Sequence, residues 1–128
     1  MAVSRAFIDY VRDQLQPWGG GDITAQRMFS SAGLFRGGIM FALVHDDTLY
    51  FRTDAENVAD FIAAGMAPFS YARAGRSVAL GYHQVPAEVI EEPDELAQWA
   101  AAALAAAQRR STPRSRARVR RPRPRRRA

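Results

Sequence analysis

The sequence predicts an α+β domain of two layers, with helices packed on one antiparallel sheet, followed by a disordered C-terminal tail. Apolar residues recur at helical spacing near both ends of residues 1–108. Between these ends lie short runs of alternating apolar residues joined by turns, and short hairpins favour antiparallel pairing. From Ser111 onward the apolar periodicity stops. We therefore expect the order α-β-β-β-α-β-β-α before the tail.

The first helix is expected from about Arg5 to Gln16. The Ser4 hydroxyl can accept a hydrogen bond from an amide of the first turn, so Ser4 is a suitable N-cap. Helical spacing places four apolar residues on one stripe, namely Phe7, Ile8, Val11 and Leu15. Pro17 is expected to stop this helix, and the glycines that follow Trp18 are expected to form a loop.

The first group of strands centres on a hairpin at Gly37-Gly38. Glycine tolerates the positive φ angles that a tight hairpin requires, so Gly33–Arg36 should pair with Ile39–His45. Both faces of Ile39–His45 are apolar, which predicts a central strand covered on both sides. A turn then leads into the strand Leu49–Arg52. The β-prone run Thr24–Phe29 is left open as an extra strand.

The second helix is predicted from a capping box over residues 53–56, in which Thr53 and Glu56 each satisfy the other's backbone amide. Gly65 supplies the left-handed residue that ends this helix. Another hairpin should follow, with Phe69–Arg73 paired to Ser77–His83.

A third helix is expected to close the domain. Pro93 suits its first turn, where the missing amide costs nothing, and Glu92 or Asp94 is the expected cap. The residues predicted for its buried side are Leu96, Trp99, Ala100, Ala103 and Ala107.

Charge divides the 128-residue chain into two unlike parts. Residues 1–108 contain seven arginines and 13 acidic residues, a net charge of −6, whereas residues 109–128 contain 11 arginines and no acid, a net charge of +11. We therefore predict a folded domain over 1–108 and a disordered Arg/Pro-rich tail over 109–128. The sequence has no bilayer-spanning apolar run, no recognisable secretory signal and no cysteine, so we expect a cytoplasmic protein without membrane contact.

Few residues suit catalysis or metal binding, and we predict no catalytic residue, no metal site and no cofactor. His45 adjoins Asp46 and Asp47, which could form a weak metal cluster, but a solvated hairpin turn explains the same three residues. His83 could titrate near neutral pH, and we interpret it as a histidine at a strand end. The sequence contains no G-x-S-x-G elbow and no phosphate-binding glycine loop.

One candidate partner-binding site comprises Arg27, Met28 and Phe29, where an arginine stands within an apolar run. The structural alternative is an exposed strand arginine, or an arginine paired with an acid such as Asp22.

The tail is the other candidate site. Guanidinium groups bind phosphate in a bidentate manner, so an arginine tail predicts non-specific nucleic-acid binding driven by counterion release. The tail has no aromatic residue and therefore offers no base stacking. The alternative is a solubilising extension or the imprint of a GC-rich genome. The arginines predicted to contact nucleic acid are Arg114, Arg116, Arg118, Arg120, Arg121, Arg123, Arg125, Arg126 and Arg127.

Several segments occur in the order seen in the N-terminal domain of the TfoX/Sxy family, which this sequence resembles over about residues 5–108. The segments that carry the resemblance are Arg27-Met28-Phe29 with Gly33-Leu34-Phe35, Met40 to Val44, Leu49 to Arg52, Pro68 to Tyr71, Tyr82 to Pro86, and Leu96 to Ala107 with Trp99. Two features depart from the family pattern. Ser30 and Ser31 stand where family members usually carry glycine, and nothing here corresponds to the second, helical domain of longer members.

The resemblance implies a non-enzymatic regulatory or protein-interaction domain. The family consists of bacterial proteins associated with activating competence genes alongside a cyclic-AMP-responsive regulator. The resemblance therefore implies a protein partner such as a transcription regulator. It supplies no catalytic residues that could be carried over to this chain.

Overall fold

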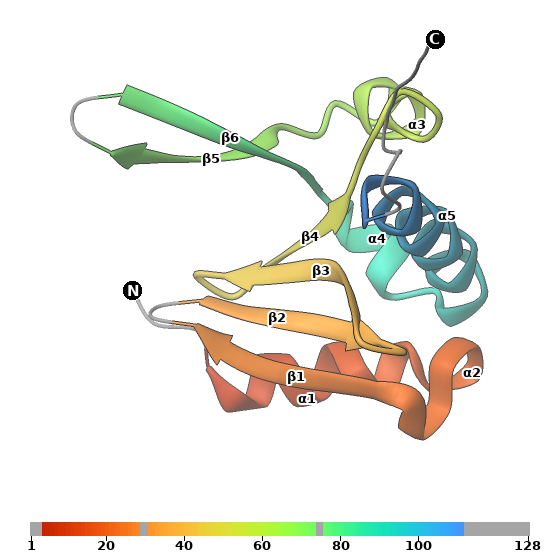
Figure 1. Ribbon diagram of the computed structural model, residues 1–128. Helices are drawn as coiled ribbons and strands as arrows, with labels where there is room; N and C mark the ends of the chain where they lie inside the picture. The colour runs from red at the N-terminus through yellow and green to blue at the C-terminus, as the bar shows by residue number, and fades with distance from the viewer. Residues whose placement is uncertain (1–3, 29–30, 74–75, 112–128) are drawn as a thin grey trace, which may run out of the picture.

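A six-stranded antiparallel sheet with the order β1-β2-β3-β4-β6-β5 forms the centre of the fold (Figure 1). The structure is a computed structural model that describes residues 4–28, 31–73 and 76–111. The strands are β1 (Ile23–Met28), β2 (Ser31–Arg36), β3 (Ile39–His45), β4 (Thr48–Arg52), β5 (Pro68–Arg73) and β6 (Arg76–Gln84). The helices are α1 (Arg5–Gln14), α2 (Gln16–Gly19), α3 (Val58–Ala63), α4 (Ala87–Ile90) and α5 (Pro93–Ser111), with a 3₁₀ turn at Gly20–Asp22.

The predicted fold class is confirmed, and the open question about residues 24–29 is answered by strand β1. Two short helices, α2 and α4, were not expected. Pro17 does not end the first helix, because it lies near the start of α2, where proline's missing amide is tolerated. Ser4 caps α1 as predicted, since its Oγ accepts a hydrogen bond from the amide of Phe7 at 3.1 Å.

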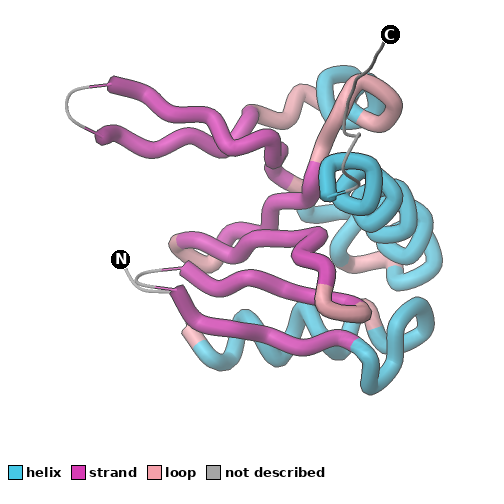
Figure 2. Tube along the Cα trace, viewed as in Figure 1, coloured by secondary structure: helices cyan, strands magenta, loops and turns pink. Residues whose placement is uncertain are grey.

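The main core lies between the sheet and helices α1, α4 and α5 (Figures 1 and 2). Phe41 is fully buried there, with its ring 5.2 Å from that of Trp18 and 6.0 Å from that of Phe51. The predicted buried side of α5 is confirmed at Leu96 and the alanines. Trp99 is only partly buried, because it lies at the margin of the core against Phe61, with ring centroids 4.8 Å apart.

A β-bulge changes which residues of β3 face the helices. Leu34 of β2 pairs with Ala42, but Phe35 pairs with Met40, so Phe41 is an extra residue on β3. As a result Phe41 and its neighbour Ala42 both join the main core. The simple alternation expected for this strand is therefore interrupted, although burial of β3 on both faces is confirmed.

A smaller apolar cluster lies on the other face of the sheet. It contains Leu43, Phe69 and Tyr82, with Met40 and Tyr50 packed against it. All five residues come from strands. The β5–β6 hairpin, which supplies Phe69 and Tyr82, extends away from the helices (Figure 1).

The predicted capping box at residues 53–56 is wrong. The helix that follows, α3, starts only at Val58, and the Thr53 hydroxyl bonds Nδ1 of His83 at 2.9 Å. Residues 53–57 form a turn instead, in which Asn57 Oδ1 accepts a hydrogen bond from the amide of Asp54 at 2.8 Å. Glu56 lies 3.3 Å from the guanidinium of Arg109, so tertiary partners have replaced the local cap.

Helix α5 begins at Pro93 as predicted and extends to Ser111. Near its end, Arg109 donates to both carboxylate oxygens of Asp54, at 2.6 and 3.0 Å. The division of the chain at residue 108 stays a prediction, and the tail beyond Ser111 lies outside the described residues. Within the described part of the chain, no helix is both long enough and apolar enough to cross a membrane.

Candidate functional site

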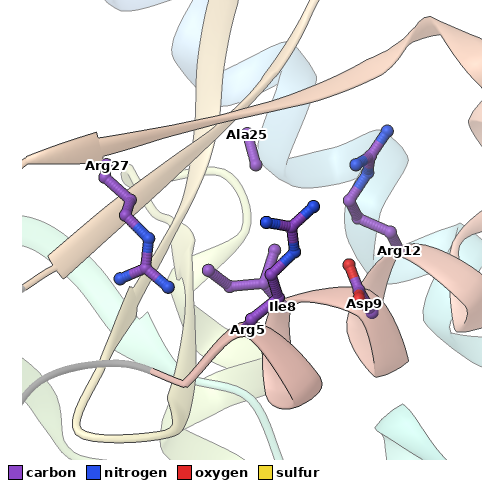
Figure 3. Close-up of a pocket in the computed structure, with 6 residues that line it drawn as sticks. All are labelled: Arg5, Ile8, Asp9, Arg12, Ala25 and Arg27. Carbon is purple, nitrogen blue, oxygen red and sulfur yellow. The ribbon is translucent and has the colours of Figure 1, made fainter.

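A groove between α1 and β1 brings three arginines together at the edge of the sheet (Figure 3). Its volume is about 220 Å³. The lining residues are Arg5, Ile8, Asp9, Arg12, Ala25 and Arg27. In the view of Figure 3 the three guanidinium groups form a row, with that of Arg5 between those of Arg27 and Arg12.

The periodicities of a helix and a strand place these side chains on one surface. Arg5, Ile8, Asp9 and Arg12 are separated by three, four and seven positions, so they lie on one face of α1. Ala25 and Arg27 are two residues apart in β1 and therefore project to the same side of the sheet. Ile8 is buried and joins the groove to the main core.

Helix α1 is held in place by hydrogen bonds at both ends. The amide of Ser4 donates to Asp47 Oδ1 at 2.8 Å, which anchors the start of α1 to the β3–β4 turn. The side-chain amide of Gln14 donates to the carbonyl of Ile90 at 2.8 Å, which anchors its end to α4. The groove is therefore bounded by a fixed helix and a paired strand.

Arg12 links the helix to the outer edge of β1. Its guanidinium donates to the main-chain carbonyl of Ile23 at 3.0 Å. In an antiparallel strand, successive residues turn their main-chain groups alternately toward the paired strand and away from it. Arg36 closes the Gly37-Gly38 hairpin with Ile39, so its main-chain groups face β3, and those of Ile23, which stands opposite it, face away from β2. By the same alternation the main-chain groups of Ala25 and Arg27 face away from β2 as well.

The charge of this region changes along its length. The groove contains three arginines and one acid, Asp9. The adjoining hollow includes both Asp9 and Asp13 beside Arg12. The positive end is therefore the one formed by Arg5 and Arg27. The N-terminal end of α1 adds its partial positive charge to this end, because Arg5 is the first residue of the helix.

Of the predicted partner-binding residues, the structure brings Arg27 into the groove. Its side chain is exposed, as the structural alternative required. Pairing with Asp22 does not fit, since five residues of extended chain, about 17 Å, separate the two positions. Met28 ends β1, and its side chain is outside the described set, as is all of Phe29. The nine tail arginines predicted to contact nucleic acid, from Arg114 to Arg127, also lie outside it.

The two histidines bond hydroxyl groups: His45 bonds Ser31 of β2, and His83 bonds Thr53, the residue after β4. His45 Nδ1 lies 2.7 Å from the Oγ of Ser31, which stands opposite it in the β2–β3 register, whereas Asp46 is 3.9 Å from Nε2. Burial lowers the pKa of His83, whose ring also packs on Phe61. Among the described residues, no group of three or more potential ligands is arranged to hold a metal ion.

Sequence reasoning also missed a separate hollow at the C-terminal ends of β4 and α5. Its walls include Arg52, Tyr82 and Arg110, and the Arg52 guanidinium lies 5.2 Å from the Tyr82 ring centroid. Gly81 makes room for this contact: its φ is +77°, and a Cβ there would lie 3.2 Å from the guanidinium. An isolated glycine within an alternating strand was the available signal. Arg5 and Arg12 were also missed, although their spacing on α1 was visible.

One antiparallel sheet with helices on one face defines this protein as a small α+β domain. The family model described as the TfoX N-terminal domain matches residues 13–107, which are 95 of the 128 residues, so the chain belongs to that family. No curated protein matches the chain. The matched range includes β1 with Ala25 and Arg27 but begins after the helix residues of the groove, so four of its six lining residues lie outside the match: Arg5, Ile8, Asp9 and Arg12.

Proposed function

We propose that this TfoX N-terminal domain is a non-enzymatic regulatory domain that acts by binding a protein partner along strand β1. The observation that carries the proposal is an open sheet edge beside an arginine groove. Of the described strands, only β2 pairs with β1. The side chains from Thr24 to Arg27 are all exposed.

An edge strand with outward-facing amides and carbonyls is a template for another strand. Most proteins cover, shorten or interrupt such edges, because an unprotected edge pairs with other chains. Here six residues form an edge strand without proline, and Ala25 and Arg27 turn their main-chain groups outward. Addition of a partner's strand would supply main-chain hydrogen bonds, while the groove would supply selectivity.

The biological setting is proposed from the resemblance to TfoX/Sxy proteins. In this setting the partner is a transcription regulator, the output is control of competence genes, and the compartment is the bacterial cytoplasm. The proposal assigns no reaction and no cofactor to the domain.

The test is co-purification from the native host with nuclease treatment, using full-length wild type, Ala25→Pro and Ala25→Ser. Proline lacks the amide that would donate to an incoming strand, and it is tolerated on the open side of an edge strand. Serine keeps that amide. We expect the wild type and Ala25→Ser to retain a protein partner that Ala25→Pro loses. The proposal is contradicted if Ala25→Pro keeps a normal thermal transition and retains the same partner.

A second candidate function is non-specific binding of nucleic acid through the tail. The composition of residues 109–128, with 11 arginines and no acid, favours it. Arg109 is already bonded to Asp54, and its second contact is Glu56. The arginines available to phosphates would therefore begin at Arg110.

A further inference from the structure

We infer that the segment that binds along β1 is an acidic extended peptide whose aspartates or glutamates alternate with uncharged residues. This inference rests on the proposed function and adds to it the chemical class of the partner. The acidic side chains would all project toward α1, into the groove drawn in Figure 3.

Strand geometry determines where the side chains of an added strand would lie. Such a strand would run about 4.8 Å beyond β1, with every second side chain on the α1 side of the sheet. Ala25 and Arg27 already project to that side and line the groove. The added residues that face α1 would therefore stand beside the outer flank of the helix, where Arg5 and Arg12 lie.

The charge of the groove selects acidic side chains at those positions. Three guanidinium groups line it against one carboxylate, that of Asp9. Arg12 also bonds the carbonyl of Ile23, and Asp9 and Asp13 lie beside it, so the end of the groove formed by Arg5 and Arg27 carries the stronger positive charge. Arginine binds carboxylates through paired, charge-assisted hydrogen bonds, and a lysine or arginine of the partner would be repelled.

The opposite face of β1 selects nothing charged. Thr24 and Gln26 project to that side, and both are exposed and uncharged. The best partner is therefore one with acids on alternate residues, and a uniformly acidic run gains nothing from its other face. This pattern distinguishes strand addition from attraction to net positive charge alone.

Charge also argues that neither the protein's own arginine tail nor a second copy of its strand β1 binds along the edge of the sheet. Residues 112–128 contain nine arginines and no acid, so the tail would place like charges against Arg5 and Arg27. A second copy of β1 would bring another Arg27 and no acidic residue to the groove. An acidic segment of a different protein is the occupant that complements the site.

The test uses the full-length chain and two capped peptides of about eight residues, a length within the usual range for a strand. Glutamate and threonine alternate in the first peptide. The second has the same composition, with all glutamates preceding all threonines. Because the two peptides carry equal charge, attraction to the arginine tail is matched. We expect the alternating peptide to bind at least about tenfold more tightly, through its added main-chain and guanidinium contacts.

Hydrogen exchange and amide chemical shifts supply the structural readout. The alternating peptide should slow exchange of the outward-facing amides of Ala25 and Arg27, which only strand addition protects. The double variant Arg5→Gln, Arg27→Gln should lose the preference for the alternating peptide, whereas Arg110→Gln should keep it. Ala25→Pro should lose the preference and Ala25→Ser should retain it.

Equal affinity for the two peptides, or shifts confined to other parts of the chain, would overturn the inference. A dimer of the wild type that Ala25→Pro dissociates would also overturn it, because a second copy would then occupy the edge. If the peptides are not distinguished but the co-purified partner still depends on the Ala25 amide, the acidic-strand inference fails while the proposed function stands.

Discussion

Phe41 is both the extra residue of the β3 bulge and part of the main core. It is the extra residue of β3, it is fully buried, and its ring contacts those of Trp18 and Phe51. A smaller side chain would leave a cavity between α2 and the sheet, because two strands and a helix fix the surrounding positions.

We predict that Phe41→Ala lowers the free energy of unfolding by about 3–5 kcal/mol, the usual cost of removing a buried aromatic ring. Ile62, whose side chain is 64% exposed, is the matched control. Ile62→Ala should change stability by no more than about 0.5 kcal/mol. Denaturant unfolding of both variants measures this, and a loss below about 1 kcal/mol for Phe41→Ala would show that the bulge does not bury this ring.

His83 makes stability depend on pH in a defined direction. Burial lowers the pKa of its imidazole below the ordinary value of 6.5, so the unfolded chain binds a proton more readily than the folded one. The stability that neutral, partly buried His83 contributes to the folded state is present in full above about pH 6.5 and is lost as the pH falls through the lowered pKa. We predict that His83→Gln flattens the decline in melting temperature between neutral and mildly acidic pH. His45 is present in both the wild type and the variant and serves as the internal control. An unchanged dependence of melting temperature on pH would contradict the assignment of this effect to His83.

Residues whose structure depends on their own neighbours were predictable from the sequence. Gly37 and Gly38 adopt φ angles of +60° and +79° in the expected hairpin, and Ser4 caps α1. Thr53 was mispredicted because its hydroxyl bonds His83, 30 residues away, in place of a local amide. No sequence pattern indicated that competition, because a capping signal does not reveal which distant partner offers a better bond.

At the scale of elements, the groove between α1 and β1 could likewise be predicted only in part, because local patterns do not reveal distant contacts. The polar side of α1 was predictable from its spacing, and β1 was left open as a strand. Their juxtaposition was not, because it depends on bonds from Ser4 to Asp47 and from Gln14 to Ile90, over 43 and 76 residues. From the sequence, Arg27 was therefore singled out but Arg5 and Arg12 were not.

Helix α5 is tied to the β4–α3 turn by Arg109, which bonds Asp54 and lowers the pKa of that carboxyl. Both side chains are partly solvated, with 39% and 29% exposure, so water weakens the pair. We predict a coupling energy of about 0.5–1 kcal/mol in a double-mutant cycle of Asp54→Asn and Arg109→Gln. Arg110→Gln, one residue further along the helix, is the control and should show no coupling to Asp54.

The sign of the pH effect provides a separate check on this pair. A carboxyl with a lowered pKa contributes stability above its ordinary value of 3.8, and loses it as the pH falls through the lowered pKa. The coupling should therefore be present at neutral pH, vanish in strong acid and weaken with added salt. A coupling that survives both conditions would mean that packing, not charge, joins Arg109 to the turn.

At the scale of the whole molecule, the separation of charge determines how the protein would meet a polyanion. Residues 1–108 carry −6 and residues 109–128 carry +11, so a nucleic acid would be repelled by the first part and attracted by the second. The proposed acidic peptide binds at the edge of the sheet, and its binding does not depend on this attraction. Nucleic-acid binding by the tail should depend steeply on salt and not on DNA sequence, whereas peptide binding at β1 should depend on the peptide's sequence.

We predict that full-length protein binds unrelated DNA duplexes with similar affinity and a steep salt dependence. Arg109 is held by Asp54, which leaves ten arginines from Arg110 onward. Each phosphate neutralised contributes about −0.9 to the slope of log affinity against log salt, so ten arginines set a limit of about −9. We expect a slope of about −5, because three prolines and the acidic domain oppose full contact. A chain ending at Ser111 should lose this binding but keep its melting temperature. Strong preference between duplexes, or retained binding by the shortened chain, would assign nucleic-acid recognition to the folded domain, because phosphate contacts do not read sequence.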